Sequence, residues 1–526
     1  MTQQQGVTIG GRHFPQVTWY KEPSLIKLYL CCGVLILTST TNGYDGSMMN
    51  GLQSLLIWQN FFHHPSASQL GLLNAIYSVG GIVAPLFVPW FADTIGRKKT
   101  IVIGLCIMFV GIAIQTAAVN IQMFIAGRFF IGFGSATSVG ACPLLITELA
   151  HPQHRAIVTT LYNTSWYAGS TIAAWTTFGT RTLQSDWAWR APSILQLWSS
   201  SIQILLIWFV PESPRYLTSR NKGEKARDIL NKYHAPSSGT ELVEAEFEEI
   251  HETIELEKAF SKRKWSELWA TKGNRHRMLI AISVGVFSQC SGNALVSYYI
   301  NKILDSIGIT DQAEQLEING GLSVYNWIVA TAICFYVDRF GRRPLFLIST
   351  AGMLCCFVAW TICSARYDIS GSPGASIGVL VFIFLDYTAY GLAYNGLLVG
   401  YVVEILPFQI RAKGFAVSQI SVSLALFFGN YVNPVGLQHA GWKFYILYDC
   451  WLAVELLVVY FFYVETKNTP LEEIARVFDG DDALVGGGIV PTKRELEYNH
   501  EKGDALFHNE FKQNSSDAEH ERKAAA

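Results

Sequence analysis

Twelve apolar stretches recur along the chain, and they constrain its fold more than any other feature. A helix needs about 20 apolar residues to cross the hydrocarbon core of a bilayer. Only 15% of the residues are charged, whereas soluble domains carry about 25%. The stretches lie at about 26–45, 70–92, 100–118, 122–147, 156–178 and 190–210, and then at about 276–300, 320–337, 344–364, 376–403, 412–435 and 442–464. The sequence therefore predicts an all-α membrane protein with twelve transmembrane helices in two six-helix halves.

Polar segments divide the chain into five parts. Lys and Arg gather in the segments after even-numbered spans and are sparse after odd-numbered ones. Because cytoplasmic loops carry the excess of these residues, both termini are predicted to be cytoplasmic. The linker shows helical spacing with alternating charge, and the tail is poor in hydrophobic residues, as in disordered segments. We expect an N-terminal cytoplasmic segment (1–25), a six-helix bundle (26–210), a cytoplasmic linker with short helices (211–275), a second bundle (276–464) and a largely disordered cytoplasmic tail (465–526).

Several other functions receive no support from the sequence. All ten cysteines fall inside the apolar spans without a CxxC pair, so we interpret them as packing residues. His63 and His64 could bind a metal, but a solvated loop explains them better in the absence of further ligands. No phosphate-binding loop supports ATP-driven pumping, and a net charge of -2 does not suggest a nucleic-acid partner. We expect no metal site and no cofactor.

Three pairs of similar segments mark an internal repeat. They are "DTIGRKKTIVIG" and "DRFGRRPLFLIS", "ITELAHPQHRA" and "VVEILPFQIRA", and "VPESPRYL" and "VETKNTPLEEI", at matching places in the two halves. Many secondary transporters consist of two related halves with a binding site between them near the bilayer midplane. The charged residues of the segments could hold the halves together as a cytoplasmic gate, or could only stabilise loop turns. They are Asp93, Arg97, Glu148, Arg155, Glu212 and Arg215 in the first half, and Asp338, Arg342, Glu404, Arg411 and Glu465 in the second.

Asp45 is an unusual carboxylate near the end of the first apolar span. No Lys or Arg occurs between Lys27 and Arg97. Its position alone leaves two interpretations open: a harmless place at the membrane interface, or a site that binds and releases a proton. Arg128 favours the second, because it also lies within an apolar span and two isolated opposite charges in one half invite pairing. An Arg contact that forms and breaks with conformation could load and release a proton.

The repeated segments and several further motifs resemble the sugar porter family of the major facilitator superfamily. The motifs are "DTIGRKK", "GRFFIGFG", "PESPRYL", "DRFGRRPL", "VEILPFQIRAKG" and "VETKNTPLEEI". "NGYDGSMMNG", "WAWRAPS", "SGNALVSYYINKIL" and "NYVNP" are most similar to the fungal branch that includes lactose and cellodextrin permeases. The resemblance implies a transporter that works by alternating access, in many members as a sugar and proton symporter. It also implies that Asp45 and Arg128 form the proton-coupling pair.

The same resemblance places candidate sugar-binding residues in five spans. Neutral sugars are held by amides, hydroxyls and aromatic faces, although an interhelical hydrogen bond could also explain each residue. Two departures from hexose-type members stand out. In the tenth helix, a glycine-proline pair and a tryptophan are replaced in this chain. In the eleventh helix, an aromatic residue is replaced. The loss of these rings should enlarge the cavity. The candidates are Asn163, Gln289, Asn293, Tyr298, Asn326, Asn395 and Ser423.

Three functional hypotheses follow from the sequence. The first is a proton-coupled sugar symporter of a fungal plasma membrane, monomeric by default, which takes up a disaccharide of the lactose or cellobiose type. Its partners would be the sugar, the proton and membrane lipid, with the proton gradient as energy source. The second is a facilitator or exporter of another small polyhydroxylated molecule. The third is a non-transporting sugar sensor, which the short, motif-free tail disfavours. None of the three is an enzyme.

Overall fold

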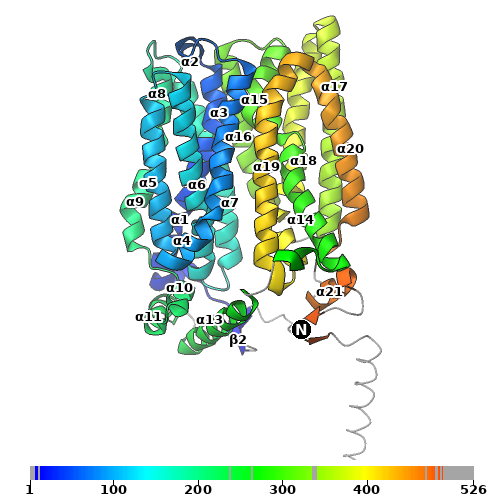
Figure 1. Cartoon of the computed structure of the whole chain (residues 1–526). Helices are drawn as coiled ribbons and strands as arrows, with labels where there is room; N and C mark the ends of the chain where they lie inside the picture. The colour runs from blue at the N-terminus through cyan, green and yellow to red at the C-terminus, as the bar shows by residue number, and fades with distance from the viewer. Residues whose placement is uncertain are drawn as a thin grey trace, which may run out of the picture.

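The chain forms two helical bundles side by side, joined by a linker at one end (Figure 1). The computed structural model describes residues 6–9, 12–235, 239–261, 265–334, 340–467, 471–479, 484–485 and 488–489. The predicted tail beyond these ranges lies outside the described residues. We name the end of the molecule that carries α10, α11 and α13 the linker end, and the end that carries α2 the opposite end.

The first bundle and the linker are made almost entirely of helices. The bundle contains α1 (Pro23–Ser54), α2 (Leu56–Phe61), α3 (Ala67–Val83), η2 (Ala84–Leu86), α4 (Val88–Ile95), α5 (Arg97–Thr116), α6 (Ile121–Leu149), α7 (Arg155–Thr180), α8 (Trp187–Leu195), α9 (Leu197–Leu206) and η3 (Ile207–Phe209). It is preceded by η1 (Trp19–Lys21) and the antiparallel strands β1 (Gly6–Ile9) and β2 (Arg12–Pro15). The linker holds α10 (Pro214–Ser219), α11 (Gly223–Tyr233), α13 (Thr240–Ser261) and η4 (Trp265–Trp269).

The second bundle repeats the arrangement of the first. It contains α14 (Lys272–Cys290), α15 (Asn293–Ser306), α16 (Gln312–Cys334), α17 (Arg342–Ser370), α18 (Pro373–Ile405), α19 (Phe408–Ala440), η6 (Gly441–Lys443) and α20 (Phe444–Phe462). After it come α21 (Leu471–Asp479) and the short paired strands β3 (Leu484–Val485) and β4 (Gly488–Ile489).

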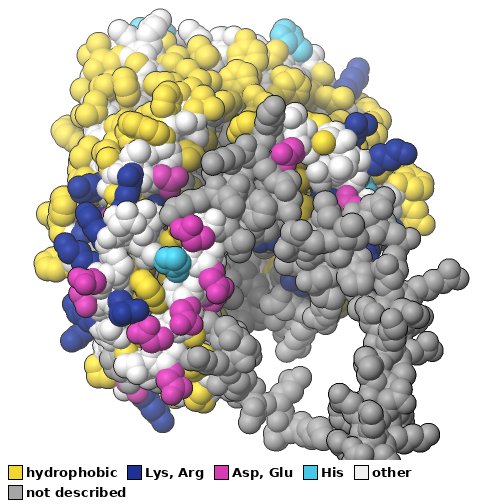
Figure 2. All heavy atoms as spheres, turned by 60° about the horizontal axis from the view of Figure 1, so that its bottom comes forward, with side chains coloured by type: hydrophobic (Ala, Val, Ile, Leu, Met, Phe, Trp, Pro, Cys, Tyr) yellow, Lys and Arg dark blue, Asp and Glu magenta, His cyan; other side chains and the backbone are white. Residues whose placement is uncertain are grey.

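The helices account for twelve membrane spans. Among the described residues, nine stretches are long and apolar enough to cross a membrane, and the last of them contains two helices, α19 and α20. The remaining two spans are α7 and α16, which pack against each other between the halves and are more polar because both line the cavity described below. Figure 2 shows hydrophobic side chains covering the flank of the molecule, with charged side chains gathered at the linker end. The twelve-helix fold predicted from the sequence is confirmed.

Each half has its own hydrophobic core. The largest cluster of buried side chains belongs entirely to the second half and centres on residues such as Phe346, Phe357 and Trp360. A separate cluster around Leu35, Leu105 and Leu145 belongs to the first half. Because the two large cores are not continuous, each bundle can move as a unit relative to the other.

Candidate functional site

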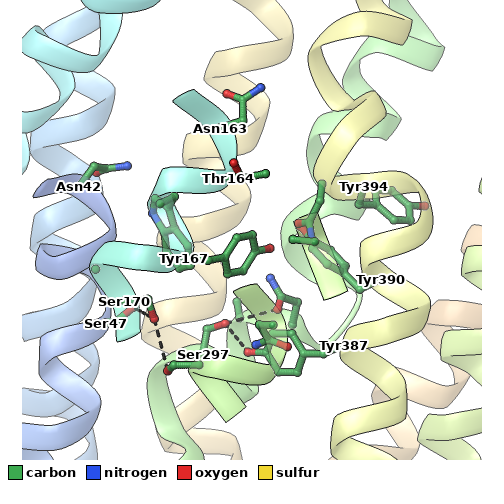
Figure 3. A pocket seen from close by; sticks show the side chains of 18 of the residues that line it. Asn42, Ser47, Asn163, Thr164, Tyr167, Ser170, Ser297, Tyr387, Tyr390 and Tyr394 are labelled. Atoms are coloured by element: carbon green, nitrogen blue, oxygen red, sulfur yellow. Dashed lines mark hydrogen bonds between the residues drawn. The ribbon is translucent and has the colours of Figure 1, made fainter. Parts of the chain in front are cut away.

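A cavity of about 480 Å³ lies between the two halves, in the middle of the molecule (Figure 3). The first half lines it mainly with α1 and α7, and the second half with α14, α15, α16 and α18. None of the described residues that line it is Asp, Glu, Lys, Arg or His. Seven asparagines, one glutamine, seven tyrosines and one tryptophan are among the lining residues, together with serines and threonines. Such a surface can match the hydroxyl groups and apolar faces of a neutral polyhydroxylated ligand.

The structure brings six of the predicted sugar-binding residues into this one cavity. They are Asn163 of α7, Gln289 of α14, Asn293 and Tyr298 of α15, Asn326 of α16 and Asn395 of α18. Ser423 of α19 is not among the lining residues, and its hydroxyl donates to the carbonyl of Gln419 in its own helix at 3.1 Å. With Asn42 and Asn50 of α1, the cavity therefore collects amides from five spans of the two halves.

Aromatic residues of α18 form a wall of the cavity, and the binding residues predicted from the sequence did not include them. Tyr387, Tyr390 and Tyr394 are spaced by three and four residues, so they share one face of the helix. The rings of Tyr390 and Tyr394 are stacked, with centroids 5.5 Å apart. Figure 3 shows these rings facing Tyr167 of α7 across the cavity. These tyrosines thus compensate for the aromatic rings that are replaced in the tenth and eleventh spans. The helical spacing of the tyrosines in an apolar span is a sequence signal that could have revealed them.

Short hydrogen bonds order the side chains at the base of the cavity. The Ser47 hydroxyl of α1 donates to Ser170 of α7 at 2.8 Å. The hydroxyls of Ser297 and Tyr387 lie 2.6 Å apart, and Ser297 also donates to the amide oxygen of Asn293 at 3.3 Å. These contacts connect α15 to α18 and fix the orientation of the Asn293 amide toward a bound molecule.

Asp45 and Arg128 lie next to each other beside the cavity, and both side chains are fully buried. The Arg128 guanidinium donates to the backbone carbonyl of Asp45 at 3.0 Å and sits 4.8 Å from the centre of the Tyr77 ring. Neither carboxyl oxygen of Asp45 has a hydrogen-bond partner among the described residues. In this conformation the predicted pair is therefore adjacent, but its guanidinium and carboxyl groups do not form an ion pair between described atoms.

Tyr77 of α3 connects this buried pair to the cavity. Its ring lies against Arg128, while its hydroxyl donates to the amide oxygen of Asn42 at 2.9 Å. Both Tyr77 and Asn42 line the cavity. Ser135 of α6 also donates to Asn42, at 3.1 Å. A ligand that moves Asn42 or Tyr77 would consequently disturb the contacts of Arg128.

Five hydrogen bonds between described residues join the two halves, and all lie on the side of the cavity toward the opposite end. Gln53 donates to the carbonyl of Tyr298 at 3.3 Å, and Asn74 donates to the Tyr299 hydroxyl at 3.0 Å. The others are Asn50 to the carbonyl of Ser297, Ser170 to Ser323 at 3.5 Å, and Asn430 to Ser78 at 3.3 Å. We call these five contacts the seam. The seam thus ties the two halves together on that side of the cavity.

The charged residues of the repeat form one cluster in each half at the linker end. In the first half, Arg97 pairs with Glu148 at 3.2 Å and with Asp93 at 3.3 Å. In the second half, Arg342 pairs with Glu404 at 3.0 Å. Each of these ion pairs joins helices of one half, and the role of the set as a gate that holds the halves together stays a prediction. Between the halves, α3 packs against α19 and α7 packs against α16, and the seam adds hydrogen bonds to this packing.

One glutamate in each half caps the helix that begins at the repeated motif. Glu212 accepts from the backbone N–H of Lys98 at 3.3 Å, at the start of α5. Glu465 accepts from the N–H groups of Arg342 and Arg343 at 2.9 and 3.1 Å, at the start of α17. Carboxylates stabilise helix N-termini because unpaired N–H groups and the helix dipole face them. Gly96 has a φ of 100°, and a side chain there would strike Glu212, which explains the glycine of the first motif.

The two capping glutamates differ in their environment. Burial raises the pKa of Glu212, although the N–H groups of Ser213 and Lys98 and the charge of Arg97 act against it. Partial burial would also raise the pKa of Glu465, but four backbone N–H groups outweigh it and lower the pKa. The cap of the second half is therefore the more firmly ionised of the two.

The remaining residues of the predicted gate have separate partners. Arg155 lies 3.7 Å from Glu246 of linker helix α13 and so connects the first bundle to the linker. Arg411 donates to the carbonyl of Leu406 at 3.1 Å. Arg215 belongs to α10, and Asp338 lies outside the described residues. His63 and His64 sit in the loop after α2, where no metal-binding group of three or more ligands is formed by described residues.

Comparison with solved structures shows the fold to which this arrangement of helices belongs. The fold is similar to that of the proton:xylose symporter XylE of E. coli bound to 6-bromo-6-deoxy-D-glucose, with a TM-score of 0.70, 22% identity, and coverage of 86% of this chain and 99% of that one. The chain therefore has the fold of the major facilitator superfamily, and the family match given next makes it a multi-pass membrane transporter and not an enzyme.

The sequence comparison then gives the family. The family described as "Sugar (and other) transporter" matches residues 31–478, and the chain belongs to it. It is 30% identical to the galactose transporter of Saccharomyces cerevisiae, over 82% of this chain and 75% of that protein. It is 28% identical to the MFS-type transporter oryC of Aspergillus oryzae, over 84% of each chain.

Proposed function

We propose that the protein takes up a neutral sugar, of disaccharide size and of the lactose or cellobiose type, together with a proton across a fungal plasma membrane. The uncharged cavity rich in amides and aromatic rings carries this proposal. Its volume of about 480 Å³ falls within the range of about 300–1,000 Å³ that suits ligands larger than fragments. The absence of charge among its described lining residues favours neutral sugars over sugar phosphates or acids.

Asp45 is the proposed proton carrier. An ionised carboxylate buried without a partner costs several kcal/mol, so the carboxyl group is expected to hold its proton in this conformation. Direct pairing with Arg128 would favour the ionised form instead. A change in the Arg128 contacts could thus switch Asp45 between loaded and empty states, and Tyr77 links that change to the cavity. The similarity to a proton:xylose symporter supports the same mechanism.

The proposed orientation places the linker end in the cytoplasm. Basic residues such as Arg97, Lys98, Arg342 and Arg343 lie at the starts of α5 and α17, at this end, in agreement with the rule that cytoplasmic loops are rich in Lys and Arg. The seam would then close the cavity toward the outside. The described conformation would be the one that releases substrate inward.

Reconstitution into lipid vesicles tests the proposal. Purified protein should accumulate lactose or cellobiose against a gradient when the outside is acidic, and added sugar should make the outer medium more alkaline. Asp45→Asn should lower accumulation well below the wild-type level while leaving exchange of labelled sugar across the membrane measurable. Asp228→Asn, the same change on an exposed face of linker helix α11, is the matched control.

Each outcome has a definite meaning. Transport of a monosaccharide alone would correct the substrate size, and flux without proton movement would make the protein a facilitator. Concentrative uptake by Asp45→Asn equal to that of the control would contradict the role of Asp45. Absence of flux for every sugar would leave the sensor hypothesis as the better one.

A further inference from the structure

Two carboxyl groups inside the second half have no place in the function proposed so far. Asp386 of α18 and Glu455 of α20 expose 1% and 0% of their surface. Glu455 lies in the apolar middle of α20, which spans Phe444–Phe462. Ionisable residues are costly within a membrane and usually mark a pathway or a proton relay.

The surroundings of Glu455 do not compensate a negative charge. Both carboxyl oxygens lack a hydrogen bond in the described part of the chain. Two neutral donors, the Ser291 hydroxyl and the Trp451 indole, lie beside the carboxyl group without meeting the geometry of a hydrogen bond, and the Ser291 hydroxyl donates to the carbonyl of Phe287 instead. The titratable groups that face Glu455 are Cys290, Asp386, Tyr390, Tyr394, Tyr448 and Tyr463, none of which is a cation.

Asp386 reinforces this argument. The two carboxyl groups are close enough to interact, and Cys356 of α17 is a further acidic neighbour of Asp386. Two carboxylates without a cation between them cannot both be ionised in a medium of low dielectric constant. Glu455 is therefore expected to carry a proton in this conformation.

Glu455 also lies against a break in the helix that lines the cavity. α14 ends at Cys290 and α15 begins at Asn293, with Gly292 between them at a φ of 96°. A side chain at Gly292 would collide with the Phe357 ring, so the glycine is required for the break. Ser291, the neighbour of Glu455, occupies the break itself.

The break connects Glu455 to the substrate cavity. Gln289 and Asn293, on either side of it, both line the cavity. Tyr390 lines the cavity as well, and its hydroxyl donates to the carbonyl of Ser288 at 2.8 Å, one turn before the break. Movement of α15 relative to α14 would therefore change both the cavity and the surroundings of the Glu455 carboxyl.

We propose that Glu455 is a second proton-binding site, which releases its proton when the break between α14 and α15 rearranges during transport and rebinds it when the break returns. Release breaks the O–H bond of the carboxyl group and passes the proton to water that enters from the cavity, leaving a carboxylate. The site rests on the proposed proton-coupled transport and adds one proton to that carried by Asp45. Two protons would then move with each sugar.

The ratio of protons to sugar in vesicles tests this directly. The wild type should move two protons per sugar, and Glu455→Gln should halve that ratio while still transporting. Asp449→Asn is the matched control, because Asp449 is on the same helix but only half-buried. An unchanged ratio in Glu455→Gln would overturn the proposal. A ratio halved in Glu455→Gln but unaffected in Asp45→Asn would instead overturn the role of Asp45.

Sugar exchange at equal pH on both sides provides a test that does not need coupling. The wild type should slow by about tenfold for each pH unit above the point at which Glu455 loses its proton. Glu455→Gln stays neutral at this position and should keep only the pH dependence that Asp45 imposes. Identical pH profiles for the two proteins would count against the site even if no proton is transported.

Infrared difference spectroscopy covers the case in which Glu455→Gln does not fold. Addition of sugar to the wild type should change the carbonyl band of a protonated carboxyl group, and Glu455→Asp should shift that band. A sugar-induced spectrum without any such band, or a band that Glu455→Asp leaves in place, would overturn the proposal.

Discussion

Tyr77 has two distinct contacts that can be separated by mutation. Its ring lies over the Arg128 guanidinium at 4.8 Å, and its hydroxyl bonds to Asn42 in the cavity wall. A cation over an aromatic ring is worth about 2 kcal/mol or more where both are desolvated. The ring thus holds Arg128 against the backbone of Asp45, and the hydroxyl reports on the cavity.

Tyr77→Leu should therefore uncouple proton and sugar movement. Loss of about 2 kcal/mol at Arg128 should lower proton-driven accumulation by about tenfold or more, with a much smaller effect on exchange. Tyr77→Phe keeps the ring and should retain coupling, but should bind sugar more weakly because the bond to Asn42 is lost. Parallel measurements of accumulation and exchange in vesicles distinguish the two. Equal losses in both assays for Tyr77→Leu would show that the ring has only a structural role.

At the scale of whole elements, a cluster of histidines holds the linker against the first bundle. His234 at the end of α11 contacts Glu246 of α13 at 2.8 Å and the carbonyl of Leu149 at 3.2 Å. The buried His151 ring lies 5.2 Å from that of His234. Burial, followed by the neighbouring His234, His154 and Arg155, lowers the pKa of His151 to about 3. His151 is therefore neutral while the linker is docked.

Acidification should loosen the linker. An undocked His151 has a pKa of about 6.5, so the undocked state binds more protons between about pH 6.5 and pH 3, and docking weakens as the pH falls through that window. Amide hydrogen exchange of α11 and α13, corrected for its intrinsic pH dependence, should show less protection at about pH 5 than at about pH 7. His151→Asn should remove most of this difference. A pH effect of the same size in His151→Asn would assign it to other groups.

The sequence predicted the membrane spans well because apolar character is a property of a local stretch of residues. It predicted the contact partners of individual side chains less well because those contacts join residues that are far apart in the sequence. Five candidate amides and Tyr298 reach one cavity because family motifs mark their helices. The sequence showed that the repeated Arg and Glu residues could pair. It did not show that each pair lies within one half, since this depends on the conformation of the whole molecule. Glu455 lies in an apolar run as Asp45 does, but no intramembrane cation in its half drew attention to it, and only burial by other helices shows that its charge has no counterion.

The whole molecule combines two rigid halves with a weak connection. The two large hydrophobic cores lie within the halves. Between the halves, α3 packs against α19, α7 packs against α16, and a smaller cluster includes Leu316, and the seam adds five hydrogen bonds between described residues. Interhelical hydrogen bonds in membranes average about 0.6 kcal/mol, so the seam contributes about 3 kcal/mol in all. Conformations of one protein that interconvert commonly differ by a few kcal/mol. The seam is thus strong enough to close one end and weak enough to open in each cycle.

Tyr299→Phe should shift this balance toward the conformation open at the opposite end. The substitution removes the bond between Asn74 and the Tyr299 hydroxyl, and with it the bond from that hydroxyl to the carbonyl of Asn430 within the second half. The loss of about 0.6 kcal/mol between the halves corresponds to a population change of about threefold. Spin labels at positions 63 and 311, on loops of the two halves at this end, should report a larger fraction of long distances. Tyr325→Phe, whose hydroxyl bonds to Thr388 within the second half, is the matched control. Because the shift changes populations without touching either carboxyl group, the proton-to-sugar ratio should stay as in the wild type. A changed ratio would mean that closure of the seam and proton binding are linked more directly than two rigid halves require.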